Sequence, residues 1–232
     1  MTIYIGIDDT DTETSRGTGR LARSIADELA PDYQIIGVSR HQLYVHDDIP
    51  YTSHNSAAVI HMESQGNGSI RRLHTLVRDL MMSDFIEGSD PGLCIIERSR
   101  IVDDIISFGG RAKTGVLTQD EARWLASGHQ IILEGLGGTE DGVIGALAGV
   151  GLAASGNDGR YVMKAKTRTM TGSRTVGELL DCGIDRIITE EGALITEGRV
   201  SMSKFPKPAL VGGQAVLIVS GSDGVYRDLV VG

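Results

Sequence analysis

The chain has 232 residues, of which 41% are hydrophobic and 23% are charged, and its formal net charge is −9. A chain of this length can bury a sizeable core, as one large domain or as a main domain with a smaller one. The negative charge excludes a protein whose whole surface docks on nucleic acid, but it leaves room for a local basic patch. Only Cys94 and Cys182 are present, which excludes a disulfide framework and a four-cysteine zinc site within one chain.

No segment of the sequence suggests export or a membrane. The start, "MTIYIGIDD", has no basic region followed by a long apolar stretch, and no later apolar run approaches the roughly 18 residues of a membrane span. We therefore expect a cytoplasmic protein that does not contact the membrane.

Strands and helices alternate through the N-terminal part of the chain. A β-branched apolar run at 2–7 predicts a buried strand. Leu21, Ile25 and Leu29 recur at spacing four and predict one apolar face of a helix over 18–30. Similar patterns predict further strands at 33–46, 55–63, 92–97 and 130–135. They predict further helices at 68–83, 99–108, 119–127 and 141–155.

Local signals indicate some of the helix ends. Thr118 with Glu121 forms a capping-box pattern at the start of 119–127. Gly109 and Gly110 are expected to stop the helix over 99–108. Because the second and third strands look like a hairpin, the predicted fold class is α/β (α+β), with a mixed β-sheet and packed helices.

After "SGNDGRY" the alternation of predicted strands and helices gives way to short β-rich runs. The Asn-Asp-Gly turn signal in this segment predicts a domain boundary between 157 and 158. Residues 1–157 would form the α/β domain, and 158–232 a small β-rich C-terminal domain. A second capping-box pattern, from Thr175 to Glu178, predicts a short helix. The remaining short runs between glycines and prolines predict an antiparallel β unit. Its strands are expected at 186–189, 192–196, 208–212, 214–220 and 225–231.

The sharpest feature of the sequence is "IGIDDTD", in which Asp8, Asp9 and Asp11 follow a buried strand. Three crowded carboxylates repel one another unless water, a cation or basic groups offset their charge. Ligands of open α/β sheets bind beyond the carboxyl ends of strands, and carboxylate oxygens suit Mg²⁺. The pattern therefore predicts metal or phosphate chemistry at the three aspartates. The alternative is an Asx-turn with a helix-facing acid, which needs no metal.

Polar residues suited to a phosphate follow in two further places. Thr18 stands where the first helix should begin, so it is either an N-cap or a hydroxyl that touches, or accepts, a phosphate. His54 and Asn55 open a strand, and they either contact base, ribose or phosphate or cap the turn. Metal binding by the histidines of this window is disfavoured, since their spacings fit no standard zinc pattern.

A glycine-rich stretch, "GLGGTEDG", precedes the helix predicted at 141–155. Backbone N–H groups at Gly135, Gly137 and Gly138 can face a phosphate, with the helix dipole adding to the attraction. Glu140 and Asp141 would repel an unescorted anion. A phosphate bound there is therefore expected to come with Mg²⁺.

A basic stripe occurs in the C-terminal part. Lys164, Lys166 and Arg168 alternate along "KAKTR", so they share one face if this stretch is a strand. The plain alternative is a solvated strand face. In an acidic chain such a stripe also offers a path for a polyanion, and contact with RNA is the corresponding hypothesis.

Four segments within the first 155 residues carry a family resemblance: "IGIDDTD", "TGRLA", "IPYTSHNSA" and "GVIGALAGVG". They resemble the kinase-type domain of the archaeal isoleucine-tRNA agmatidine synthase (2-agmatinylcytidine synthetase) family. Those enzymes use ATP and Mg²⁺ to phosphorylate a cytidine in the tRNA anticodon, so that agmatine can displace the phosphate. The resemblance implies that Asp8, Asp9 and Asp11 belong to an ATP and metal site. It also matches Thr18 to a threonine linked in that family to phosphorylation of the enzyme itself.

The sequence departs from the family in several segments. Gly17, Thr18 and Gly19 stand where the family has Cys-Thr-Thr, "TSHNS" replaces an Arg-Gly-Asn-like segment, and "GGTEDG" replaces a basic Gly-Arg-Gly loop. Two cysteines cannot supply the family's C-terminal zinc ribbon, and the residues from Tyr161 onward match nothing in it. These departures bear on the tRNA substrate more than on the nucleotide site.

We therefore predict an ATP- and Mg²⁺-dependent, kinase-like phosphotransferase whose acceptor is an RNA nucleoside or a small molecule. The predicted catalytic residues are Asp9 and Thr18. The predicted metal ligands are Asp8, Asp9 and Asp11. The predicted nucleotide contacts are Thr10, Thr18, Asn55, Gly137, Gly138 and Thr139. The alternatives are a nucleotide-binding regulatory or accessory module without turnover, and RNA binding without catalysis; self-association into a homo-oligomer stays open.

Overall fold

The computed structural model describes residues 1–12, 17–49, 54–64 and 69–230. The chain forms two compact units, Met1–Ser155 and Gly156–Gly232. The boundary predicted from the sequence lies two residues further along, between 157 and 158. Over the described part of the chain, no helix is long and apolar enough to cross a membrane.

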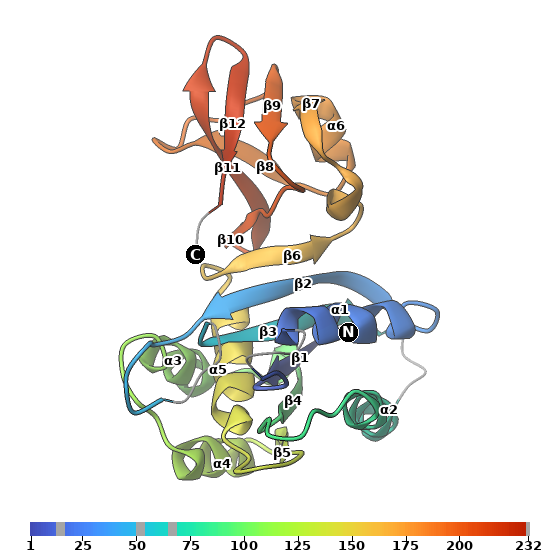
Figure 1. The fold of residues 1–232 in the computed structure, drawn as a ribbon, viewed down its shortest axis with the longest axis vertical. Coiled ribbons are helices and arrows are strands. Elements are labelled where there is room, and N and C mark those ends of the chain that lie inside the picture. Colours follow the sequence, from blue (N-terminus) through green and yellow to red (C-terminus); the bar gives the residue numbers. More distant parts are fainter. Residues whose placement is uncertain (13–16, 50–53, 65–68, 231–232) are drawn as a thin grey trace. The chain divides into compact units, whose positions relative to one another are not determined.

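The first unit is built on an antiparallel sheet (Figure 1). Its strands pair in the order β5-β4-β1-β3-β2. They are β1 (Thr2–Asp8), β2 (Gln34–Gln42), β3 (Ser56–Glu63), β4 (Gly92–Glu97) and β5 (Ile132–Gly135). The helices of the unit are α1 (Thr18–Leu29), α2 (Ile70–Ser83), α3 (Asp103–Arg111), α4 (Gln119–Gly128) and α5 (Gly142–Ser155). Up to β4, the chain follows the β-α-β-β-α-β order of ferredoxin-like folds.

The sheet buries both of its faces, as β1 illustrates. Ile3, Ile5 and Ile7 point to the face that α1 and α2 cover, and each is at most 1% exposed. Tyr4 and Gly6 point to the other face, where α5 packs. Burial on both faces explains why this strand is a continuous apolar run in the sequence.

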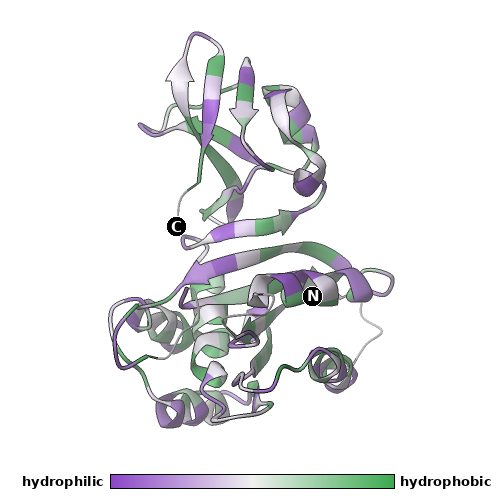
Figure 2. Cartoon of the chain, viewed as in Figure 1, coloured by the Kyte–Doolittle hydropathy of each residue, from purple (hydrophilic) through white to green (hydrophobic). Residues whose placement is uncertain are grey.

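Helix α5 approaches the sheet closely because it consists of small and apolar residues. Figure 2 draws it mainly in green and white, whereas α1, α2 and α4 mix hydrophobic and hydrophilic residues. A Cβ atom on Gly6 would overlap the carbonyl oxygen of Ala146 in α5, so this glycine permits the approach. The contact brings the start of α5 beside the carboxyl end of β1.

Helix α3 differs from the helix expected at 99–108. It begins at Asp103, after a 3₁₀ turn at Arg98–Arg100, and continues through Gly109 and Gly110. Gly109 packs against α5, where a Cβ atom would lie 2.7 Å from the carbonyl oxygen of Ala148. The expected stop is therefore wrong, because the glycine serves a close contact between two helices.

Both predicted capping boxes are confirmed. At the start of α4, the Thr118 hydroxyl accepts from Glu121 N at 3.3 Å, and the Glu121 carboxylate accepts from Thr118 N at 3.0 Å. Thr175 and Glu178 form the same pair of bonds at the start of α6 (Val176–Asp181). Each box satisfies N–H groups that a helix start would otherwise leave unpaired.

The second unit is a small β-rich unit with both parallel and antiparallel pairs. Its strands are β6 (Arg160–Lys164), β7 (Gly172–Thr175), β8 (Arg186–Thr189), β9 (Arg199–Met202), β10 (Ala209–Val211), β11 (Gln214–Ser222) and β12 (Val225–Leu229). They pair in the order β6-β10-β11-β12-β9-β7, and β8 pairs with β11. Its core is formed by buried residues such as Leu179, Ile187 and Leu217.

Two details of this unit correct the prediction, although the α/β class with a mixed sheet is confirmed. The pairs β8–β11 and β9–β12 are parallel, so the purely antiparallel expectation is wrong. Parallel partners need long connections, and here those connections contain other strands, which run lengths in a sequence do not reveal. The strand expected at 192–196 is only an isolated bridge between Ile188 and Leu194.

Candidate functional site

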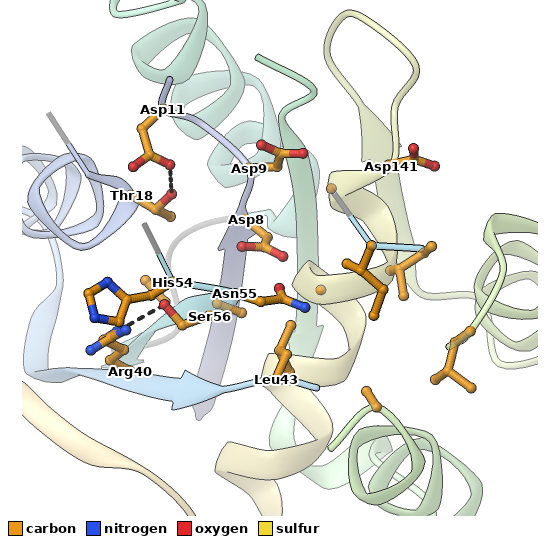
Figure 3. A pocket seen from close by; sticks show the side chains of 18 of the residues that line it. Asp8, Asp9, Asp11, Thr18, Arg40, Leu43, His54, Asn55, Ser56 and Asp141 are labelled. Carbon is orange, nitrogen blue, oxygen red and sulfur yellow. Dashed lines mark hydrogen bonds between the residues drawn. The ribbon is translucent and has the colours of Figure 1, made fainter. Parts of the chain in front are cut away.

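A cavity of about 340 Å³ opens at the carboxyl end of β1, within the first unit (Figure 3). Its wall comes from the ends of β1 and β2, the starts of α1, β3 and α5, and the segment between α3 and α4. Part of the wall is acidic, and another part is apolar. The apolar side chains are Leu43, Ile49, Val116, Leu117 and Ile144.

Asp8 ends β1 and packs its side chain against α5. A Cβ atom on Gly145 would overlap the Asp8 carboxylate, so glycine at this position makes room for it. Burial, together with the negative charges of Asp9 and Asp11, raises the pKa of Asp8 to about 8. A hydrogen bond from the Asp9 backbone lowers this pKa but offsets only part of the rise. In the free protein at neutral pH, Asp8 is therefore mostly protonated.

Asp9 turns the chain at the end of β1. Its φ of 51° lies in the left-handed region, which aspartate tolerates better than most residues. Its carbonyl oxygen accepts from Asp90 N at 3.2 Å. Burial raises the pKa of Asp9 to about 6, and the carboxylates of Asp90, Asp11 and Asp141 add to the rise. At pH 7, Asp9 is therefore mostly ionised but more basic than an exposed aspartate.

Thr18 is the first residue of α1, and its hydroxyl faces Asp11. Gly17 is the N-cap, so the N-cap alternative for Thr18 is wrong. The Thr18 hydroxyl donates to Asp11 Oδ1 at 3.2 Å and accepts from Thr10 Oγ1 at 3.1 Å. Thr10 is 3% exposed and is not among the described residues that line the cavity. Thr18 thus lines the cavity, and the buried Thr10 hydroxyl holds the Thr18 hydroxyl in place by its hydrogen bond.

Asn55 lines the cavity directly before β3. Its side-chain amide donates to the Tyr44 carbonyl oxygen at 2.6 Å. The backbone carbonyl oxygen of Asn55 accepts from Gln42 Nε2 and from Leu43 N, both at 2.8 Å. These bonds tie the start of β3 to the segment that follows β2. His54 lines the same part of the cavity.

Part of the glycine-rich stretch, namely Gly135, Gly137, Gly138 and Thr139, is not among the described residues that line the cavity, whereas Asp141 and Gly142 at its end do line it. Gly137 is next to the Phe85 ring, and the Thr139 amide donates to the Asp90 carboxylate. A Cβ atom on Gly138, whose φ is 59°, would overlap the same carboxylate. Asp90 therefore occupies the place beside these amides where we expected a phosphate.

Arg40 and Asp141 also line the cavity, although the sequence indicated no role for Arg40 and marked Asp141 only as a group that would repel an unescorted anion. Arg40 projects from β2, and its Nε donates to Ser56 Oγ at 2.9 Å. The Asp141 carboxylate accepts from Gln119 Nε2 at 2.7 Å and from Thr139 Oγ1 at 2.9 Å. Their positions depend on which segments meet in the fold, and no local pattern reports that.

The aspartates do not form a ready-made metal site. Among the residues that the structure describes, no three His, Cys, Asp or Glu side chains are placed to hold a metal ion together. Asp11 turns to Thr18, whereas Asp8 packs against α5. Mg²⁺ often uses one or two carboxylates and completes its shell with water and substrate phosphates. The arrangement therefore fits Mg²⁺ that arrives with a nucleotide better than a permanently bound ion.

The basic stripe of the second unit is not one strand face. β6 ends at Lys164, Lys166 lies in the turn that follows, and Arg168 lies in a 3₁₀ turn at Thr167–Thr169. The Arg168 guanidinium stacks over the Phe205 ring, 4.1 Å from its centroid. The expectation is wrong because alternation places side chains on one face only while a strand continues.

Comparisons with known proteins give the fold of part of this chain relatives among solved structures. No protein-family model matches the sequence, and no curated protein matches it. The isoleucine-tRNA agmatidine synthetase TiaS in its apo form is 25% identical over 65% of this chain and 35% of its own, with a TM-score of 0.56.

Two further solved structures are similar over the same share of this chain. The complex of TiaS with its isoleucine tRNA and ATP is 26% identical over 65% of this chain and 36% of that chain, with a TM-score of 0.57. A tRNA fluorescent labeling enzyme is 25% identical over 65% of this chain and 36% of its own, with a TM-score of 0.56. This chain therefore resembles part of the synthetase and spans about a third of its length. The resemblance expected from the sequence is confirmed.

Proposed function

We propose that the first unit binds ATP together with Mg²⁺ in the cavity at the end of β1, and that the protein is an ATP-dependent phosphotransferase. The observation that carries this proposal is the gathering of Asp8, Asp9, Asp11 and Thr18 at one cavity. The fold supports it, since it resembles part of a synthetase that has been solved with ATP. The acceptor would be an RNA nucleoside or a small molecule.

The apolar part of the cavity wall suits the base of a nucleotide, and the acidic part suits its phosphates when they carry Mg²⁺. Apolar side chains such as Leu43, Val116 and Ile144 would pack against the base. Asp8 and Asp11 would hold Mg²⁺ at the acidic part of the wall, because carboxylate oxygens are its preferred protein ligands. When bound, Mg²⁺ neutralises charge on the phosphate oxygens. Without a cation, the carboxylates would repel a triphosphate.

Asp9 would accept the proton of the acceptor hydroxyl or bind the metal with its neighbours. Its pKa of about 6 leaves it ionised at neutral pH and still a better base than an exposed aspartate. Thr18 and Asn55 would line the phosphates, with Thr10 holding the Thr18 hydroxyl in place. Catalysis in such sites depends mainly on positioning and on stabilising charge at the phosphoryl oxygens.

Thr18 has a second proposed role, and the assignment of the glycine-rich loop depends on Asp90. Thr18 is itself a candidate acceptor, because its hydroxyl reaches the cavity and donates to Asp11. Phosphate contacts from the glycine-rich loop would require Asp90 to release the Thr139 amide. We therefore assign the loop residues to the nucleotide site only on that condition: Gly137, Gly138 and Thr139.

Asp9→Asn tests the catalytic role. Asparagine keeps the shape of the side chain but cannot accept the proton, so transfer of labelled γ-phosphate from ATP to the protein or to added acceptors should fall to background. Circular dichroism should show an intact fold. Asp27→Asn, on the exposed side of α1, makes the same charge change and should keep wild-type transfer. Undiminished transfer by a folded Asp9→Asn protein would refute the role.

A nucleotide-binding regulatory or accessory module without turnover is the second candidate. One observation favours it: Asp90 accepts from the Thr139 amide, so the glycine-rich loop does not offer this donor to a phosphate. Such a module would bind ATP but would neither consume it nor label itself, with RNA or with small-molecule acceptors. Release of ADP by the wild-type protein, absent from Asp9→Asn, would exclude this candidate.

Contact of the second unit with RNA is a separate proposal. It is supported by the exposure of Lys166 and Arg168 and by the stacking of Arg168 on Phe205, which holds the guanidinium where it could stack on a base. Lys164 lies nearby at the end of β6. The resemblance of part of this chain to TiaS, which has been solved with its isoleucine tRNA, motivates RNA as the polyanion.

A further inference from the structure

Arg40 differs from the other charged residues of the cavity. It is the only lysine or arginine among the described lining residues, whereas five aspartates line the same cavity: Asp8, Asp9, Asp11, Asp48 and Asp141. Its guanidinium donates to Ser56 Oγ at 2.9 Å, through Nε, and to Gln42 Oε1 at 3.4 Å, through Nη2. Both partners are neutral, and no carboxylate of the described chain forms an ion pair with Arg40.

A partly buried guanidinium without an anionic partner is costly to keep. Burial lowers the pKa of Arg40, but an arginine stays protonated in a protein. Among the described residues, the hydrogen-bond partners Ser56 and Gln42 satisfy N–H donors of Arg40 but carry no charge that would compensate its guanidinium. Such a charge at the wall of a cavity is complementary to an anionic group that enters from solution.

The position of Arg40 on β2 keeps its side chain in one place. Arg40 pairs with Ala58 across the β2–β3 ladder, and the Ser56 hydroxyl holds Nε. In Figure 3, the guanidinium lies beside Ser56 and His54 at the cavity. With Nε engaged by Ser56 and one N–H of Nη2 engaged by Gln42, Nη1 and the second N–H of Nη2 can contact a ligand.

We propose that Arg40 binds a phosphate of the nucleotide, and that Ser56 positions its guanidinium for this contact. The inference rests on the proposed nucleotide site and names the residue that would compensate phosphate charge together with the metal. A planar guanidinium can offer two parallel N–H bonds to a phosphate, which the ammonium group of a lysine does not reproduce. Arg40 would therefore be a binding residue and Ser56 a positioning residue.

Calorimetric titration of the full chain with adenosine and with a non-hydrolysable ATP analogue, both in Mg²⁺, tests the inference. Arg40→Gln should weaken binding of the ATP analogue about tenfold or more and that of adenosine less than about twofold. Arg40→Lys should restore only part of the loss, and Ser56→Ala should cost about threefold for the ATP analogue alone. Arg20→Gln removes the same charge from the exposed side of α1, where Arg20 lines a different groove, and should bind like the wild type.

The outcomes separate this inference from the proposed site. If the wild type binds the ATP analogue and Arg40→Gln binds it equally well, the Arg40 role is refuted and the nucleotide site stands. Equal losses for adenosine and for the analogue, or a lower melting temperature without a selective loss for the analogue, would assign Arg40 a structural role and overturn the inference. If the wild type binds neither compound, the proposed nucleotide site itself fails.

Discussion

Replacing Asp8 with asparagine should stabilise the nucleotide-free protein at alkaline pH. Burial and neighbouring carboxylates raise the pKa of Asp8 from its ordinary value of 3.8 to about 8. Because the folded pKa lies above the unfolded one, the folded state binds the proton more tightly, and this contribution to stability is lost as pH rises from about 4 to about 8. Asparagine cannot ionise, so the variant should not show the loss.

The size of the effect follows from the shift. One pKa unit corresponds to about 1.4 kcal/mol, so the full shift would amount to about 5–6 kcal/mol. Asp8 lines a cavity, and the high effective dielectric constant there reduces the cost. We therefore expect the difference in free energy of unfolding, Asp8→Asn minus wild type, to increase by about 2–3 kcal/mol between about pH 4 and pH 8.5.

Urea unfolding of both proteins across this pH range, without metal or nucleotide, measures the effect. Asp27→Asn on the exposed side of α1 serves as the control and should show no such growth. Addition of Mg²⁺ and an ATP analogue should then stabilise the wild type more than Asp8→Asn, because a ligand stabilises the state that binds it. If the difference in free energy of unfolding between wild type and Asp8→Asn stays constant with pH, the Asp8 carboxyl is not destabilised by burial in its ionised form.

Gly109→Ala should lower the free energy of unfolding by about 1–3 kcal/mol, because its Cβ meets the backbone of α5, whereas Gly110→Ala should raise it by about 0.5–1 kcal/mol. Thermal unfolding checks this pair, and equal effects would contradict the close packing of α3 on α5. Thr118→Ala should cost about 1 kcal/mol in urea unfolding by removing the capping box, and no change would show that the box adds nothing in solution. Three basic residues of the second unit can be neutralised together: Lys164, Lys166 and Arg168. Their neutralisation should weaken binding of single-stranded RNA in a filter assay and reduce the salt dependence of that binding, and unchanged binding would end the RNA proposal.

Local patterns sufficed where the physical cause lies within a few residues. The capping box of Thr118 and Glu121 involves two side chains one turn apart, so their order in the sequence already determines the contact. The strand that ends at Asp8 is apolar at almost every position because both of its faces are buried. These signals indicated the α/β class and drew attention to the three aspartates.

Features that depend on distant contacts could not be predicted in this way. Gly109 has the sequence signature of a helix stop, and only the neighbouring α5 shows why a glycine is needed inside α3. Arg40 reaches the cavity because β2 pairs with β3, next to the end of β1. Thr139 was expected to contact the nucleotide, but its amide donates to Asp90, which lies far away in the sequence.

The central claim is that the cavity at the end of β1 binds ATP with Mg²⁺. Calorimetric titration of the wild-type protein with a non-hydrolysable ATP analogue, once with Mg²⁺ and once with excess chelator, tests it most directly. Binding should lie in the micromolar range, should require Mg²⁺ and should be lost in variants of Asp8 and Asp11. Absence of binding under both conditions would contradict it and leave "IGIDDTD" as a structural turn.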